Sequence, residues 1–363
     1  MKAGIVGLPN VGKSTLFNCL SNTKAQSANF PFCTIEPNIG IISVPDKRLE
    51  NLEKLVNPEK VIPATVEIVD IAGLVKGASK GEGLGNQFLA NIRETDAIIH
   101  VLRCFDDDNI VHVEGSIDPV RDKEIIDLEL QLKDLETVEK RRDKIARLIK
   151  TGNKEAIAEN TLLVKLINHL HSFKPVRSLD FSDKEKILID TMQLITNKPV
   201  LYICNVDESS AVVGNSYVDQ IKMVIEEENT EFIILAVAIE ADINELDTYE
   251  ERQVFLSDIG LSEPGSSKMI RKAYNLLNLQ TYFTAGVKEV RAWTILKGMS
   301  ASQAAGVIHT DFEKGFIKAE VISYSNYIKF GSESKAREVG KLKIEGKDYI
   351  VNDGDIMHFR FNI

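Results

Sequence analysis

The run Gly7-Leu-Pro-Asn-Val-Gly-Lys-Ser14 has the residue types and the spacing of a loop that binds nucleotide phosphates. In the pattern G-x-x-x-x-G-K-[ST], glycines let backbone N–H groups turn toward an anion, and the following helix adds the positive end of its dipole. Lys13 is expected to reach the β- and γ-phosphates, and the Ser14 hydroxyl to ligate Mg²⁺. The predicted nucleotide contacts in this run are Asn10, Val11, Gly12, Lys13, Ser14 and Thr15.

Two further segments have the residue types needed to contact a γ-phosphate and its metal ion. Asp70-Ile-Ala-Gly73 ends an apolar stretch, where Asp70 would hold Mg²⁺ through water and the Gly73 N–H would contact the γ-phosphate. Thr34 lies in a loop between the first helix and the next strand and can complete the Mg²⁺ coordination. Ser14 and Thr34 are therefore the predicted metal ligands, with an ordinary turn threonine as the alternative for Thr34.

Hydrolysis cannot rely on the usual glutamine, because Leu74 follows Gly73. Many GTPases place at this position a glutamine that orients the attacking water. His112, in an acidic loop after a predicted strand, could position the water instead, since a histidine donates or accepts a proton near neutral pH. We therefore predict Lys13 and His112 as catalytic residues. A surface histidine without a catalytic part is the alternative for His112.

The residues Asn205-Val206-Asp207-Glu208 stand where a guanine site carries N-K-x-D. Val206 removes the lysine stem that packs along the base. Glu208 replaces the aspartate that accepts hydrogen bonds from guanine, and adenine has no N1–H or N2 amine to offer it. A site built for a polar contact discriminates strongly once that contact is lost. The sequence therefore predicts that Asn205, Val206 and Glu208 form a base pocket that favours adenine.

Apolar stretches are expected to form the parallel strands that position these residues. They are residues 3–6, 64–70, 96–102, 199–204 and 232–237. Between the third and fourth stretches, apolar residues recur at three- and four-residue steps, which predicts an antiparallel helical hairpin interrupted at residues 151–153. The predicted seam comprises Ile125, Leu128, Leu132, Leu135, Val138, Ile145, Leu148, Ile157, Leu163, Leu166 and Leu170. After residue 280, short strands separated by glycines indicate a further domain.

Composition limits the class of protein and of partner. The 363 residues carry a net charge of −10 and suggest two or three domains. The last 83 residues are net +2 and the first 280 net −12, so an anionic partner is expected at the C-terminal end. Four scattered cysteines indicate reduced thiols in the cytoplasm, and no apolar stretch is long enough to span a membrane. The first strand begins close to Met1, so no signal or transit peptide is expected.

With these motifs, the chain closely resembles the YchF / Obg-like ATPase family. The matching runs include residues 7–14, 29–38, 70–86, 205–208, 280–286, 308–316 and 346–351. The resemblance implies a P-loop α/β fold of Obg type, a G domain over residues 1–280. It further implies a helical coiled-coil insertion at 121–190 and a C-terminal TGS domain of β-grasp type at 281–363.

The resemblance also carries functional expectations. It implies Mg²⁺-dependent hydrolysis of ATP in preference to GTP, and binding to the ribosome, either the large subunit or the whole particle, with rRNA as a possible contact. Phe105 matches an aromatic that lies against the adenine, and His112 matches a histidine proposed to assist hydrolysis. Asn10 matches an asparagine that can help to hold K⁺ beside the phosphates. No membrane partner is expected.

Two readings of the function remain open. The chain is either a slow regulatory ATPase of translation or the stress response, or a ribosome- or RNA-binding module in which ATP is mainly structural. Five glycines between Gly73 and Gly85 favour the switch, because a loop ordered by the γ-phosphate needs such freedom. Basic residues near an aromatic one in the last domain could contact RNA, or could be solvated around a buried tryptophan. They are Lys288, Arg291, Trp293, Lys314, Lys318 and Lys329.

Overall fold

The chain folds into two compact units, each described here by itself. The computed structural model describes residues 1–21, 38–71 and 84–362. Within this part, the first unit comprises residues 1–21, 38–40, 67–71 and 84–269, and the second comprises residues 41–66 and 270–362. Thr34, Gly73 and Leu74 lie outside the described residues.

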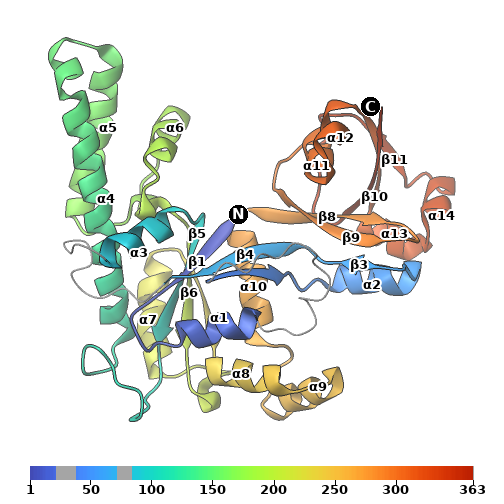
Figure 1. The fold of residues 1–363 in the computed structure, drawn as a ribbon, viewed down its shortest axis with the longest axis horizontal. Coiled ribbons are helices and arrows are strands. Elements are labelled where there is room, and N and C mark those ends of the chain that lie inside the picture. Colours follow the sequence, from blue (N-terminus) through green and yellow to red (C-terminus); the bar gives the residue numbers. More distant parts are fainter. Residues whose placement is uncertain (22–37, 72–83, 363) are drawn as a thin grey trace. The chain divides into compact units, whose positions relative to one another are not determined.

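The predicted site is positioned by a β-sheet with parallel central strands, in an α/β arrangement (Figure 1). Its strands, in spatial order, are β2 (Ile39–Ser43), β4 (Thr65–Asp70), β1 (Lys2–Val6), β5 (Ala97–Arg103), β6 (Val200–Asn205) and β7 (Glu231–Leu235). Neighbours from β4 to β7 are parallel. Every residue of β5 and β6 is buried, as expected for central strands covered on both faces. The carboxyl ends of β1, β4, β5 and β6 therefore meet at one edge of the sheet.

Helices follow most of these strands along the chain. In order they are α1 (Lys13–Ser21), α3 (Leu84–Arg93), α4 (Pro119–Lys150), α5 (Lys154–His171), α6 (Asp183–Met192), α7 (Ser216–Glu227), α8 (Val237–Glu245), α9 (Tyr249–Asp258) and α10 (Gly265–Leu276). In the described part of the chain, no helix has the length and the apolar character needed to cross a bilayer.

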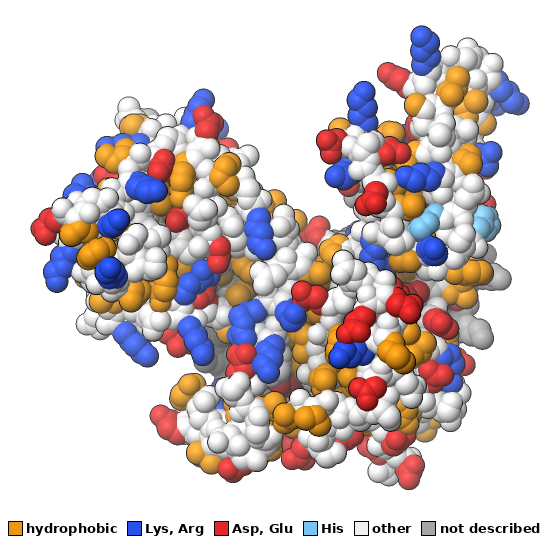
Figure 2. All heavy atoms as spheres, turned by 180° about the vertical axis from the view of Figure 1, so that it is seen from behind, with side chains coloured by type: hydrophobic (Ala, Val, Ile, Leu, Met, Phe, Trp, Pro, Cys, Tyr) orange, Lys and Arg blue, Asp and Glu red, His pale blue; other side chains and the backbone are white. Residues whose placement is uncertain are grey.

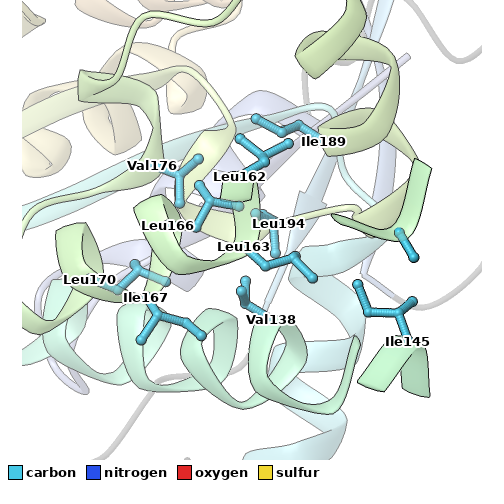
Figure 3. Packing of buried hydrophobic residues seen from close by; sticks show 11 residues of the cluster. Val138, Ile145, Leu162, Leu163, Leu166, Ile167, Leu170, Val176, Ile189 and Leu194 are labelled. Carbon is cyan, nitrogen blue, oxygen red and sulfur yellow. The ribbon is translucent and has the colours of Figure 1, made fainter. Parts of the chain in front are cut away.

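The helices α4 and α5 form the predicted hairpin between β5 and β6 (Figure 1). The predicted break is confirmed, since α4 ends at Lys150 and Asn153 caps the start of α5. Figure 3 shows the core of the hairpin, where Val138 on α4 meets Leu163 and Leu166 on α5.

Part of the predicted seam is wrong. Leu128 is 38% exposed, Leu148 50% and Ile157 45%. The first turns of α4 pack against α7 and the sheet rather than α5, so a different stripe, including Ile126 and Leu130, is buried there. A polar anchor also holds α4 close to the start of β6. Asp134, which is fully buried, accepts hydrogen bonds from the backbone of Ile195 and Thr196 just before β6.

The second unit is a sheet of short strands covered by helices. Its strands, in spatial order, are β11 (Lys343–Glu345), β10 (Phe316–Ser323), β12 (Asp355–Phe361), β8 (Leu279–Ala285), β9 (Val290–Leu296) and β3 (Val61–Ile62). Its helices are α2 (Lys47–Val56), α11 (Ala301–Ile308), α12 (Thr310–Lys314), α13 (Tyr324–Phe330) and α14 (Glu333–Glu338). The core of this unit gathers Tyr282, Ala305, Val321, Met357 and Phe359.

Residues 41–66 pack with the C-terminal strands in the second compact unit. The strand β3 pairs with β9 in parallel, and Arg48 of α2 donates to Asp353 at 2.7 Å. The guanidinium of Arg48 also lies over the ring of Phe283, 5.3 Å from its centroid.

Only some of the residues that were expected to contact RNA are exposed to solvent. Trp293 is half-buried, its indole N–H donates to Thr284, and the Arg291 guanidinium lies 3.8 Å from its ring centroid. The exposed lysines share the surface with acids, and on the face shown in Figure 2 basic and acidic side chains are interspersed. Such a mixture is typical of a solvated surface.

Candidate active site

A loop between β1 and α1 forms the centre of the site. Gly7 has a φ of 154° and Gly12 a φ of 97°. A Cβ on Gly12 would lie 2.5 Å from Nδ2 of Asn205, so only glycine fits between the loop and that side chain. The Leu16 N–H donates to the Gly12 carbonyl, which begins α1 directly after the loop. Backbone amides and a helix N-terminus thus lie together, the arrangement that binds phosphate.

Lys13, the first residue of α1, lies folded back over the loop. Its Nζ donates to the Leu8 carbonyl at 2.6 Å, and the residue is 7% exposed. Burial lowers the pKa of Lys13 from 10.5 to about 8, and the negative charge of Asp70 offsets part of that effect. A buried ammonium group with a single carbonyl partner is strongly stabilised when a polyanion binds beside it.

Ser14 and Asp70 meet beside this lysine. The Ser14 hydroxyl donates to Oδ2 of Asp70 at 3.2 Å, joining the start of α1 to the end of β4. The other oxygen, Oδ1 of Asp70, is buried and has no hydrogen-bond partner among the residues that the structure describes. A buried carboxylate oxygen left unpaired is costly unless a cation or a water meets it.

The loop that follows β5 is held against the phosphate loop. Arg103, at 1% exposure, donates to the carbonyls of Phe105, Asp107 and Ile110. Its guanidinium also lies 4.7 Å from the ring centroid of Phe105. The buried guanidinium of Arg103 therefore holds the backbone of this loop and packs over one face of the Phe105 ring.

Asn10 connects the two loops. It has a φ of 63°, a conformation that asparagine tolerates better than most residues. Its Nδ2 donates to the Val111 carbonyl at 3.1 Å. His112 is the next residue along this chain segment, so its backbone is fixed beside the phosphate loop.

His112 is buried rather than at the surface, and its catalytic role stays a prediction. Its side chain is 4% exposed, and Nε2 lies 2.8 Å from Oδ2 of Asp122, whose side chain is 1% exposed. The Glu114 N–H donates to Nδ1 of His112 at 3.1 Å. Both ring nitrogens are thus engaged within the protein.

The residues expected around the base lie at the end of β6. The Asn205 amide bridges two segments, because Nδ2 donates to the Val11 carbonyl at 2.9 Å and Oδ1 accepts from the Val237 N–H at 3.0 Å. Val206 is buried at 3%, and the Glu208 side chain is exposed.

Asp207 is the other carboxylate of this segment, and it is engaged locally. It caps the short 3-10 helix Glu208–Ser210 by accepting from the backbone and hydroxyl of Ser210, and from the hydroxyl of Ser209. These hydrogen bonds lower the pKa of Asp207. Of these two carboxylates, Glu208 is the more exposed to solvent.

The structure brings together most of the predicted site residues. Asn10, Gly12, Lys13 and Ser14 form the loop. Val11 is 1% exposed and contributes through its backbone, and Thr15 is exposed.

Arg103 and Asp122 were not predicted from the sequence. A charged residue closing the buried strand β5 was a signal for Arg103. Asp122 carried none beyond its place in the first turn of a helix.

Two family models match the chain. One, described as 50S ribosome-binding GTPase, matches residues 2–148. The other, YchF-GTPase_C, described as a protein of unknown function, matches residues 279–362.

Relatives match over the full length. The ribosome-binding ATPase YchF of Escherichia coli O157:H7 is 54% identical over 362 residues, which are 100% of this chain and 99% of that protein. A Bacillus subtilis (strain 168) protein of the same name is 52% identical over 365 residues and 100% of both chains. The solved structure of the Schizosaccharomyces pombe YchF GTPase has a TM-score of 0.91 at 40% identity, covering 99% of this chain and 97% of that one. The bacterial relatives are named ATPases and the yeast protein a GTPase, so the base preference has to be argued from the site.

Proposed function

The chain belongs to the YchF family, and from this we propose that it is a Mg²⁺-dependent ATPase that prefers ATP to GTP and binds the ribosome. The observation that carries the proposal is the geometry of the phosphate loop, where Lys13, Ser14 and Asp70 converge beside a helix N-terminus. Hydrolysis of the β–γ phosphoanhydride needs mainly positioning and charge stabilisation, which these groups supply. The cytoplasm is the compartment that ribosome binding implies.

The donor set at the phosphate loop fits a magnesium ion. The unpaired Oδ1 of Asp70 and the Ser14 hydroxyl are the oxygens that would hold it, with Thr34 as a further ligand expected from the sequence. Mg²⁺ typically takes one or two protein oxygens and completes its shell with phosphates and water. When bound, the ion neutralises charge that develops on the phosphates. Ser14→Ala is expected to raise the Mg²⁺ concentration needed for half-maximal turnover, with Ser21→Ala, at the exposed end of the same helix, as the control.

Asn10 is the residue that would hold a potassium ion. Its Nδ2 already donates to the Val111 carbonyl, so its Oδ1 is the atom suited to a cation. Replacing K⁺ by Na⁺ at constant ionic strength is expected to lower turnover in the wild type and not in Asn10→Ala. Equal turnover of the wild type in both salts would remove potassium from the proposal.

Adenine preference is supported by the chemistry at the end of β6. Val206 is buried and offers no ammonium, Asp207 is engaged by two serines, and Glu208 is exposed one position further along. Phe105, fixed by Arg103, is the aromatic proposed to lie against the base.

Competition of ATP and GTP for the purified protein tests this preference. ATP is expected to bind at least about tenfold more tightly, about 1.4 kcal/mol. Val206→Lys combined with Glu208→Asp restores the guanine pattern and is expected to move the preference toward GTP. Tighter binding of GTP by the wild type would refute adenine selection. Lys13→Ala is the control for the site itself and is expected to abolish hydrolysis.

The nucleotide state is proposed to regulate ribosome binding during translation or the stress response. Co-sedimentation with ribosomes, measured with ADP and with a non-hydrolysable ATP analogue, is the direct test. Binding that differs at least about fivefold between the two states supports a switch, about 1 kcal/mol of coupling. Equal binding in both states supports the alternative, a ribosome-binding module in which ATP is structural.

The domain limits belong to the same proposal. A G domain over residues 1–280, its helical insertion at 121–190 and a TGS domain at 281–363 describe the chain in the terms of its family. The parallel pairing of β12 with β8 and the helix α11 packed on that sheet support a β-grasp assignment for the last domain.

A further inference from the structure

Both ring nitrogens of His112 are occupied by partners inside the protein. Nε2 lies 2.8 Å from Oδ2 of Asp122, and Nδ1 accepts the Glu114 N–H at 3.1 Å. A histidine that positions a water needs one ring nitrogen free to face it. In this conformation His112 has none, and its side chain is 4% exposed.

The two hydrogen bonds also define the tautomer of the ring. A backbone N–H is a donor only, so Nδ1 must present its lone pair to Glu114. Asp122 presents a carboxylate oxygen, so the ring proton is on Nε2 and is donated to it. A histidine paired in this way has a defined orientation, set by the carboxylate.

Asp122 is itself held firmly. Its Oδ1 accepts from Nη2 of Arg121 at 2.9 Å and from Nε at 3.3 Å, and its side chain is 1% exposed. Arg121 also donates to the hydroxyl and the carbonyl of Ser116. Asp122 and Arg121 together therefore tie His112 and the loop after it to the first turn of α4.

The helix is the fixed side of this contact. Lys123, the next residue on α4, is buried and bonds to Asp127 and to Glu228 at the end of α7. Asp134 fixes α4 further along. In the loop, by contrast, Val111 is 75% exposed, and Glu114 and Gly115 are exposed as well.

We propose that Asp122 is a positioning residue that holds His112 in a resting orientation, so that ATP turnover requires the imidazole to leave this carboxylate. The inference rests on the proposed ATPase function and on His112 as the group that positions water. Rotation away from Asp122 frees Nε2, and the Asn10–Val111 contact keeps the backbone beside the phosphate loop while the side chain turns. Asp122 acts on the reaction only through His112.

Turnover measurements on four proteins test the proposal. Asp122→Ala is expected to raise kcat at least threefold with ATP affinity within twofold of the wild type. His112→Ala is expected to lower kcat at least tenfold, and the double variant should match His112→Ala. Asp118→Ala is the matched control, because it removes a carboxylate that caps the same helix without touching His112. Its kcat should stay within twofold of the wild type.

The ring state gives a readout that does not depend on hydrolysis. Imidazole ¹⁵N shifts, with His112 assigned among the six histidines by a His112→Gln variant, report the tautomer. The wild type with ADP should show the Nε2–H form, and Asp122→Ala should lose it. Asp122→Asn, which keeps an acceptor oxygen but not the charge, should lie between them and guards against a variant that fails to fold.

Each outcome decides the proposal. An Asp122→Ala protein that folds and has an equal or lower kcat overturns the resting role, as does a ring state unchanged by that variant. A double variant as fast as Asp122→Ala shows that the acid does not act through His112 and also overturns it. A wild type no more active than Lys13→Ala refutes the ATPase function separately, and the ring-state measurement then still decides whether Asp122 holds His112.

Discussion

Asn205→Ala should loosen the phosphate loop, because the amide of Asn205 joins the loop to the segment that begins α8. It donates to the Val11 carbonyl at 2.9 Å and accepts from the Val237 N–H at 3.0 Å. The residue is 4% exposed, so water does not readily replace either partner. Truncation leaves one buried acceptor and one buried donor unsatisfied.

The magnitude follows from those two groups. An unsatisfied buried polar group costs about 1–3 kcal/mol, so the variant is expected to lose about 3 kcal/mol of unfolding free energy. For a unit of this size, that corresponds to a Tm lower by about 6–12 °C. ATP affinity should fall at least about tenfold, about 1.4 kcal/mol, because the backbone amides of the loop lose their fixed position.

Circular dichroism melting and nucleotide titration measure the two effects. Ile203→Ala is the control, since it removes a buried side chain on the same strand, outside the predicted base pocket and without a side-chain hydrogen bond. It should lower Tm and leave ATP affinity nearly unchanged. ATP affinity equal to that of the wild type in Asn205→Ala would refute the idea that this amide holds the loop.

Three further outcomes are expected. Leu163→Ala, at a fully buried site in the hairpin, should cost about 2–4 kcal/mol in denaturant unfolding, whereas Leu148→Ala, 50% exposed, should cost under about 1 kcal/mol. Asp134→Ala should lower Tm and increase amide exchange at Ile195 and Thr196, because those backbone donors lose their carboxylate; unchanged exchange there would contradict this role. ATP binding should take up protons near pH 8–9 in calorimetry, because burial lowers the pKa of Lys13 to about 8 and a triphosphate raises it again. The uptake should vanish in Lys13→Arg and be small at pH 7, where the lysine is already mostly protonated.

Local chemistry made the phosphate loop predictable. Gly12 must be glycine because a Cβ would meet Asn205, and Lys13 and Ser14 open a helix directly after it. These residues are neighbours in the sequence and also in the structure, so their spacing along the sequence was enough to locate the phosphate loop. The break at residues 151–153 was found for the same reason, since one Asn cap separates two helices.

Long-range contacts account for what the sequence did not reveal. Arg48 pairs with Asp353, and β3 adds to the C-terminal sheet through two residues only, so neither has a periodic signal. Leu128 follows the helical period of the seam but lies where α4 has turned to a different partner. Periodicity gives the face of a helix and not the element that covers it.

Two independent features of this chain are expected to slow the proposed hydrolysis, and they differ in kind. Leu74 stands where a glutamine would orient water, and no rearrangement gives a leucine that ability. His112 has the chemistry but is held at Asp122, and a hydrogen bond can be broken and remade. A chain with the first feature alone would be slow in every state, whereas one with the second can be accelerated by whatever turns the imidazole of His112 away from Asp122. Stimulation by ribosomes that disappears in both His112→Ala and Asp122→Ala would therefore identify the second feature as the regulated one.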